Sequence, residues 1–227
     1  MINRLLARLR RPERGWDPVP AEHAARYSAL EWANVDLRLL DDLEARIGGL
    51  AGKTVLDLGG GPGHYSAAMA QRGARVTWHD VSARYMAIAR DKAAQAGLDG
   101  RIEFSLGYLD EAPGLLGRRF DLVFNRICWY YGFSDRSFAA VLVSLVQPGG
   151  FVYADTTHAA YRHGELSASA RLRTWLNGAF ALKIGHPMPP RGRLARLFLQ
   201  HGPARLEVDY RSPTNDRLLM QMPGAPE

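Results

Sequence analysis

The sequence contains a single cysteine and no long hydrophobic run. Because Cys128 has no partner for an intrachain disulfide, we expect a reducing compartment and a cytoplasmic protein. The longest apolar stretch, residues 138–146, falls far short of the roughly 20 residues that cross a bilayer, and Ser144 interrupts it. Arginines are interleaved with the apolar residues of the N-terminus, so no secretory signal is expected.

Acidic residues are also fewer than basic ones. The chain has 23 Asp and Glu against 29 Lys and Arg, which gives a net charge of +6. Much of the excess lies near the two ends, because residues 1–14 carry five arginines and one acid, and residues 183–205 carry five basic residues and no acid. No aromatic and basic stacking motif accompanies this charge. A solvated basic face is therefore favoured over nucleic-acid binding.

The length and the composition of the chain predict one globular domain. The chain has 227 residues, of which 47% are hydrophobic and 23% charged, close to the average of folded domains. The N-terminus predicts a short basic amphipathic helix, because four apolar residues with helical spacing lie opposite the arginines: Ile2, Leu5, Leu6 and Leu9. Such a helix can make peripheral contact with an anionic membrane, or it can pack on its own domain or fray.

After two interrupting prolines the helical pattern resumes over 21–47, and from residue 53 short apolar strands alternate with helical stretches. This alternation predicts a parallel sheet with helices on both faces. The expected strands are 54–58, 75–79, 102–106, 120–125 and 151–155. The expected helices are 64–71, 83–96 and 135–146.

With the remaining segments, the chain is expected to form one structural domain that consists of four regions. Residues 147–150, QPGG, are expected to form a turn before the fifth strand. Residues 159–202 read as a helical insert broken at Pro187, Pro189 and Pro190, and 205–210 with 217–222 as a hairpin. The regions are an N-terminal helical cap (1–50), a core (51–158), a helical lid or insert (159–203) and a C-terminal hairpin (204–227).

The most informative segment is residues 54–66, TVLDLGGGPGHYS. An apolar strand runs into a glycine cluster and then a helix, which lets the backbone approach a ligand closely. A dinucleotide fingerprint would need glycine at His64 or Ser66, and a P-loop would need Gly-Lys-Ser/Thr, so neither fits. Asp80 ends the next strand, where a carboxylate can hold the two hydroxyls of a ribose.

Residues 55–63 resemble the first motif of class I S-adenosylmethionine-dependent methyltransferases. Segments 76–82, 120–125 and 147–150 are similar to the family's second strand, fourth strand and the turn before strand five. The resemblance covers about residues 54–155. It implies a Rossmann-like, doubly wound and mostly parallel seven-stranded sheet, with an antiparallel C-terminal hairpin, and S-adenosyl-L-methionine as the cofactor.

The resemblance also implies a cofactor site. The glycines would line the methionine and ribose, Asp57 would lie near the amino group, and Val81 would pack against adenine. The family usually has an acid where this chain has Tyr108, so either Asp110 serves instead or Leu109 contributes backbone contacts and packing. The expected cofactor residues are Asp57, Gly59, Gly61, Gly63, Asp80, Val81, Leu109, Asp110 and Asn125.

The acceptor should lie beyond strands four and five, because ligands bind at the carboxyl ends of parallel strands. An aromatic cluster follows strand four and reads either as a pocket wall or as a hydrophobic plug: Trp129, Tyr130 and Tyr131. Arg126 can bind an anionic acceptor group or pair with an acid such as Asp155.

His158, after strand five, is the preferred general base, because its titration range suits proton removal near neutrality. His64 is expected to contact or shield the cofactor instead. The remaining histidines are scattered and Cys128 stands alone, so no metal site is expected.

These features predict a methyltransferase that transfers a methyl group to an O, N or C atom of a small molecule by in-line displacement. One alternative is an RNA or protein methyltransferase that docks through its basic insert, and another is a non-catalytic protein that has kept the fold. The insert and the N-terminal helices are expected to cover the cleft with an apolar lid formed by Trp16, Tyr27, Trp32, Trp175 and Phe180.

Overall fold

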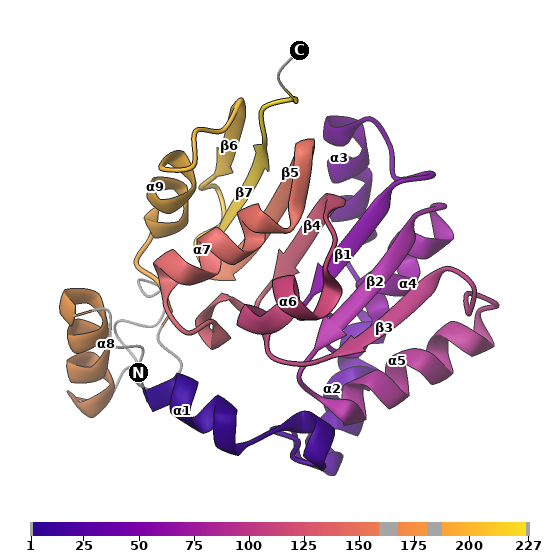
Figure 1. Cartoon of the computed structure of the whole chain (residues 1–227), viewed down its shortest axis with the longest axis horizontal. Helices are drawn as coiled ribbons and strands as arrows, with labels where there is room; N and C mark the ends of the chain where they lie inside the picture. Colours follow the sequence, from indigo (N-terminus) through magenta and orange to yellow (C-terminus); the bar gives the residue numbers. More distant parts are fainter. Residues whose placement is uncertain (1, 159–167, 181–187, 226–227) are drawn as a thin grey trace.

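The computed structural model describes residues 2–158, 168–180 and 188–225. Its centre is a seven-stranded sheet in the order β3-β2-β1-β4-β5-β7-β6 (Figure 1). The first five strands run parallel, whereas β7 is antiparallel to both β5 and β6. The strands are β1 Thr54–Leu58, β2 Arg75–Asp80, β3 Ile102–Leu106, β4 Phe120–Arg126, β5 Val146–Thr157, β6 Arg205–Asp209 and β7 Asn215–Gln221. The predicted fold class is confirmed.

Helices cover both faces of the sheet (Figure 1). One face packs against α2 (Ala21–Ala33), α3 (Leu37–Ile47), α4 (His64–Gln71) and α5 (Ala83–Gln95). The other packs against α6 (Ala112–Leu116), α7 (Asp135–Ser144) and α9 (Arg193–Leu199). Alternation along a strand divides its side chains between two cores, so Phe124 enters the first core and Val123 the second.

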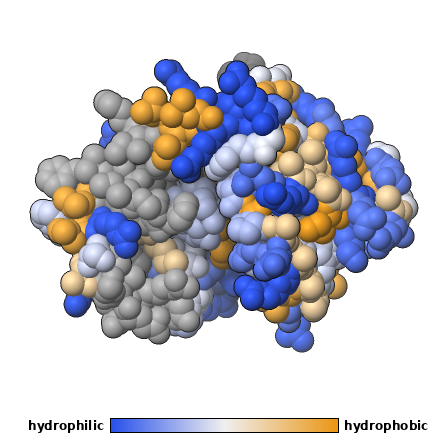
Figure 2. All heavy atoms as spheres, turned by 90° about the horizontal axis from the view of Figure 1, so that it is seen from below, coloured by the Kyte–Doolittle hydropathy of each residue, from blue (hydrophilic) through white to orange (hydrophobic). Residues whose placement is uncertain are grey.

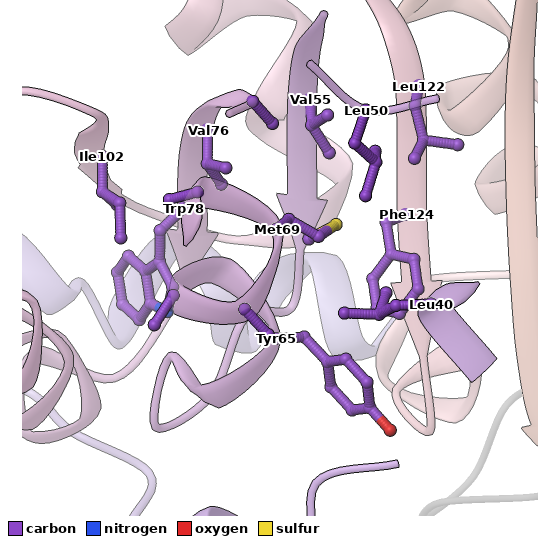
Figure 3. Close-up of a cluster of buried hydrophobic side chains, with 14 of the residues drawn as sticks. Leu40, Leu50, Val55, Tyr65, Met69, Val76, Trp78, Ile102, Leu122 and Phe124 are labelled. Atoms are coloured by element: carbon purple, nitrogen blue, oxygen red, sulfur yellow. The ribbon is translucent and has the colours of Figure 1, made fainter. Parts of the chain in front are cut away.

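The first core positions the loop between β1 and α4. Trp78 of β2, Met69 of α4 and Phe124 of β4 are buried together beneath it (Figure 3). Burying one such side chain contributes about 1.5 to 3 kcal/mol, so the packing of α4 on the sheet fixes where this loop lies.

The expectation of one helical run over 21–47 is corrected. The structure has two helices, because α2 ends at Ala33 and α3 begins at Leu37. Asp36 caps α3 by accepting a hydrogen bond from the backbone N–H of Leu39 at 3.2 Å. A capping side chain of this kind satisfies an N–H that has no partner within the helix, and so favours a new start.

The expectation of a turn at 147–150 before strand five is also corrected. β5 already begins at Val146, which pairs with Phe120 of β4, and the register then shifts so that Phe151 pairs with Leu122. Gly149 takes a φ of +74° and donates its N–H to the carbonyl of Pro223. The four residues therefore form an irregularity within the strand.

Shorter elements escaped the sequence pattern. They are the single turns η2 (Leu109–Glu111) and η3 (Trp129–Tyr131) and the helix α6, all of which follow strands. The N-terminus forms α1 (Ile2–Leu9) and the turn η1 (Pro12–Arg14). Of the insert, the structure describes α8 (Ala168–Phe180) and α9; Pro189 and Pro190 precede α9, and Pro187 lies outside the described residues.

Candidate active site

The loop after β1 is held by the end of the neighbouring strand. The N–H groups of Gly59 and Gly60 both donate to the carbonyl of His79, at 2.7 and 3.2 Å. The N–H of Gly63 then donates to the carbonyl of Gly60, and α4 begins at the next residue. The loop is therefore a tight turn built on β2.

The glycines of this loop face different surroundings. A side chain at Gly59 would overlap Cys128, one at Gly60 would overlap Trp78, and one at Gly63 would overlap Ala89. At Gly61, in contrast, no atom lies within 4 Å of the position that a Cβ would take, and φ is +49°. Neighbouring protein atoms thus leave no room for a side chain at Gly59, Gly60 or Gly63, whereas Gly61 borders open space.

Asp80 at the end of β2 lies directly beside Gly61. One carboxylate oxygen accepts the N–H of Gly61 at 3.0 Å, and the other accepts the N–H of Ser82 at 2.9 Å. Burial raises the pKa of Asp80, and these backbone hydrogen bonds oppose the rise. Val81, which follows, is half-buried. The two predicted residues Gly61 and Asp80 are therefore in direct contact.

Asp57 lies within β1, below the loop. Its side chain is buried and accepts a hydrogen bond from the hydroxyl of Ser66 at 2.6 Å. Burial raises the pKa of Asp57 to about 6, while the bond from Ser66 and the proximity of His64 act in the opposite direction. This carboxyl is an acceptor held rigidly between β1 and α4.

The residues after β3 form hydrogen bonds and ring contacts with other parts of the protein. Tyr108 donates its hydroxyl to the carbonyl of Arg10 at 2.6 Å, and its ring stacks on Trp16 with centroids 6.0 Å apart. Asp110 accepts the N–H of Phe133 at 2.9 Å. Leu109 is buried behind Gly59. The residue at the position usually held by an acid therefore anchors the N-terminal segment.

That N-terminal segment is also bound to the end of β2. Asp17 accepts hydrogen bonds from the hydroxyl of Ser82 and the backbone N–H of Arg84, both at 2.9 Å. Trp32 of α2 donates its indole N–H to the carbonyl of Pro62 at 3.0 Å. Residues before β1 thus contact the segments after β1, β2 and β3.

The aromatic residues of the lid expected from the insert and the N-terminal helices lie in different surroundings. Trp16 and Trp32 make the contacts just described, and Tyr27 packs near Tyr85 of α5 with ring centroids 6.0 Å apart. Trp175 of α8 is exposed, and the side chain of Phe180 lies outside the described residues. The expectation that α9 forms part of this lid is corrected. The helix buries its apolar residues in the second core beside α7, so it supports a sheet face and does not cover the strand ends.

At the end of β4, Asn125 links two strands. Its side-chain amide donates to the carbonyl of Leu58 at 2.8 Å and lies 2.7 Å from the sulfur of Cys128. Asn125 is fully buried. It therefore fixes the end of β1 relative to the segment after β4.

The aromatic cluster after β4 divides into a buried and an accessible part. Trp129 is fully buried, donates its indole N–H to Asp135 at 3.0 Å and packs on Phe138, so it is the hydrophobic plug and not a pocket wall. Tyr130 is half-buried and Tyr131 is exposed, with ring centroids 4.6 Å apart. Within this cluster, the two tyrosines are the side chains accessible to an acceptor.

Arg126 pairs with the acid that the sequence suggested. Its Nε lies 3.3 Å from a carboxylate oxygen of the buried Asp155, and its guanidinium lies 5.1 Å from the centroid of the Tyr65 ring. Asp155 also accepts the side-chain amide of Asn215 at 2.7 Å and lies 3.5 Å from Nε of Arg217. Burial raises the pKa of Asp155, and these partners oppose the rise.

The two histidines differ in their surroundings. His158 is only 1% exposed, and neither of its ring nitrogens forms a hydrogen bond with any residue that the structure describes. His64 lies at the start of α4 with Nε2 3.3 Å from Glu31 of α2, and this contact lowers the pKa of Glu31. Sequence reasoning missed Glu31, because nothing along the chain indicates that α2 returns to the glycine loop.

Neither a metal site nor a membrane-spanning helix is found in the described ranges. No group of three or more His, Cys, Asp or Glu side chains there is arranged to hold a metal ion. No helix within those ranges is both long and apolar enough to cross a membrane.

Comparison with known proteins agrees with this geometry. Residues 55–150 match a family model described as a methyltransferase domain. This segment, which holds the glycine loop and Asp80, is similar to methyltransferase domains.

Relatives of this chain include the ubiquinone biosynthesis O-methyltransferase of Cronobacter sakazakii, 34% identical over 49% of this chain and 45% of that protein. The enzyme of the same name from Pseudomonas paraeruginosa is 39% identical over 48% of this chain and 46% of its own length. The chain thus spans about half the length of these two curated relatives. A methyltransferase structure from Methanococcus maripaludis, described as putative, has a TM-score of 0.64 at 18% identity, with 91% of this chain and 94% of that chain covered, which shows the fold.

The raised pKa of the buried Asp57 predicts a pH dependence of stability. The pKa of this carboxyl is 3.8 when the group is exposed and about 6 in the fold. Its contribution to the free energy of unfolding is therefore fully present below pH 3.8 and is lost as the pH rises through about 6, by roughly 3 kcal/mol.

Urea unfolding of the wild type and Asp57→Asn, from about pH 4 to pH 7 without added ligand, measures this effect. We expect the wild type to lose stability relative to the variant as the pH rises. A stability difference that stays constant over this range would contradict the assignment.

Proposed function

We propose that the chain binds S-adenosylmethionine between the glycine loop and Asp80 and transfers its methyl group to a small organic acceptor. The observation that carries this proposal is the contact of Gly61 with Asp80, where backbone without a side chain borders open space beside a carboxylate. Both carboxylate oxygens already accept a backbone N–H and retain lone pairs for hydroxyl donors. The residues present therefore fit a ribose.

Six of the nine expected cofactor residues have a role in this proposal. Asp80 accepts the ribose hydroxyls, and Val81 packs against the adenine. Asp57 accepts from the amino group, directly or through water, and Gly61 provides the close backbone approach. Leu109 and Asn125 support the loop from behind, since both are buried against it.

The acceptor is proposed to be small and to react through oxygen. The curated relatives are named O-methyltransferases, and Tyr130 and Tyr131 offer rings to a compact organic molecule. When bound, S-adenosylmethionine supplies an electrophilic methyl group. The protein then has to align the acceptor oxygen and exclude water. The buried single cysteine supports a cytoplasmic setting for this reaction.

Two residues are proposed to assist the acceptor. His158 accepts the proton from the acceptor hydroxyl, since its ring nitrogens have no hydrogen-bond partner among the described residues. Arg126 orients the acceptor from the end of β4, with its guanidinium held by Asp155.

Replacing Asp80 tests the ribose contact. Asp80→Ala should weaken binding of S-adenosylmethionine and of its demethylated product by about 1.5 to 3 kcal/mol, the range for a hydrogen bond to a charged group. Calorimetric titration measures the affinity, and Asp91→Ala on the exposed side of α5 is the control. An unchanged affinity in Asp80→Ala would remove the assignment, and failure of the wild type to bind either compound would favour a non-catalytic role.

A larger side chain at Gly61 tests the close approach. Gly61→Val should abolish cofactor binding, because the side chain would occupy the space that the cofactor needs. Gly97→Val is a matched control, since Gly97 also has a positive φ and open space at its Cβ position but lies after α5. Both variants carry similar backbone strain, so equal loss of binding would show that strain, and not the ligand space, is responsible.

Replacing His158 tests the proton acceptor. His158→Ala should lower kcat about 100-fold with an aromatic diol as acceptor, while cofactor affinity is retained. Release of the demethylated cofactor measures the rate, and His201→Ala, in the loop after α9, is the control. A rate equal to that of the wild type would mean that another group, or water, takes the proton.

A further inference from the structure

Helix α1 packs on the protein through Ala7 and leaves the side chains of Leu5 and Leu9 outside. Ala7 is buried, whereas Leu5 and Leu9 are 59% and 71% exposed. The guanidinium of Arg4 lies 5.7 Å from the centroid of the Phe133 ring. Because Leu5 and Leu9 are four residues apart, they share one outer face of the helix.

Basic side chains surround this exposed apolar face. Residues 1–14 contain five arginines and one acid. Arg8 is exposed next to Leu9, and Arg10 is exposed with its guanidinium 5.9 Å from the Trp16 ring. Exposed leucines beside arginines are typical of helices that lie in a membrane interface, where apolar side chains enter the acyl boundary and cations meet phosphates.

Helix α8 repeats this composition. Leu172 and Trp175 are 56% and 61% exposed, Arg171 and Arg173 are exposed, and its 13 residues include no acid. Figure 1 shows α1 and α8 at the lower left of the molecule, outside the sheet. Figure 2 views the molecule from below and shows hydrophobic and hydrophilic residues close together on this side.

We propose that α1 and α8 dock this side of the protein on the surface of an anionic lipid bilayer. Arginine side chains would bind lipid phosphates while Leu5, Leu9 and Trp175 enter the interface. A second copy of the chain fits less well, because it would bring arginines against arginines. A nucleic acid would match the arginines and leave the leucines in water.

Docking would also affect the methyl transfer, a consequence that rests on the proposed function. α1 contacts Phe133, shortly after the two tyrosines of the proposed acceptor region. Docking would therefore bring that region close to the bilayer, where an acceptor with an apolar tail is concentrated.

Cosedimentation of the full chain with vesicles tests the docking. We expect binding to mixed phosphatidylcholine and phosphatidylglycerol vesicles, weak binding to pure phosphatidylcholine, and release by salt. The double variant Leu5→Ser/Leu9→Ser should bind the anionic vesicles at least about tenfold more weakly, because it loses two apolar side chains. Arg4→Gln/Arg8→Gln should lose the preference for anionic lipid.

The matched control is Leu199→Ser, which alters a leucine on α9 that is 59% exposed, as Leu5 is, and should leave vesicle binding unchanged. Circular dichroism and cofactor titration verify that each variant is folded, and separate a failure of docking from a failure of the proposed function. The proposal is overturned if wild type and the leucine variant bind the vesicles equally or not at all. It is also overturned if the leucines drive self-association in sedimentation velocity, or if an RNA oligonucleotide binds independently of them.

Discussion

The hydrogen bonds between the glycine loop and the end of β2 are the constraint on which the site depends. His79 accepts from two loop N–H groups, and the next residue, Asp80, accepts from a third. These bonds fix the loop and the carboxylate relative to each other before any ligand arrives. Preorganisation of this kind lowers the cost of binding, because little has to be ordered when the ligand enters.

The shape of the loop is in turn set by the cores on both faces of the sheet. Trp78 and Ala89 from the first core fill the space beside two loop glycines, and Cys128 from the second fills the space beside Gly59. The open position at Gly61 remains because none of these side chains reaches it. The packing that stabilises the fold therefore also defines the space that a ligand would occupy.

The N-terminal segment shows how a local change in sequence is compensated by tertiary structure. Tyr108 stands where the family that the sequence resembles usually has an acid, and its hydroxyl and ring hold Arg10 and Trp16. Asp17 attaches the same segment to the start of α5. The ends of β2 and β3 are thus joined to the beginning of this chain, which ties the proposed cofactor site to the helix proposed to lie on the membrane.

The sequence by itself located β1 to β4, the glycine loop and Asp80 at the end of β2, because strand periodicity and a run of glycines are local properties that neighbouring residues decide. β1 and β3 were predicted with their observed ends, and the pattern of β1, loop and α4 already indicated a nucleotide-type site. Only the tertiary structure decided that Trp129 is a plug, that Arg126 pairs with Asp155 and that Glu31 approaches His64. These outcomes depend on contacts between residues far apart in the chain, and burial and pairing energies of that kind leave no periodic pattern in the sequence.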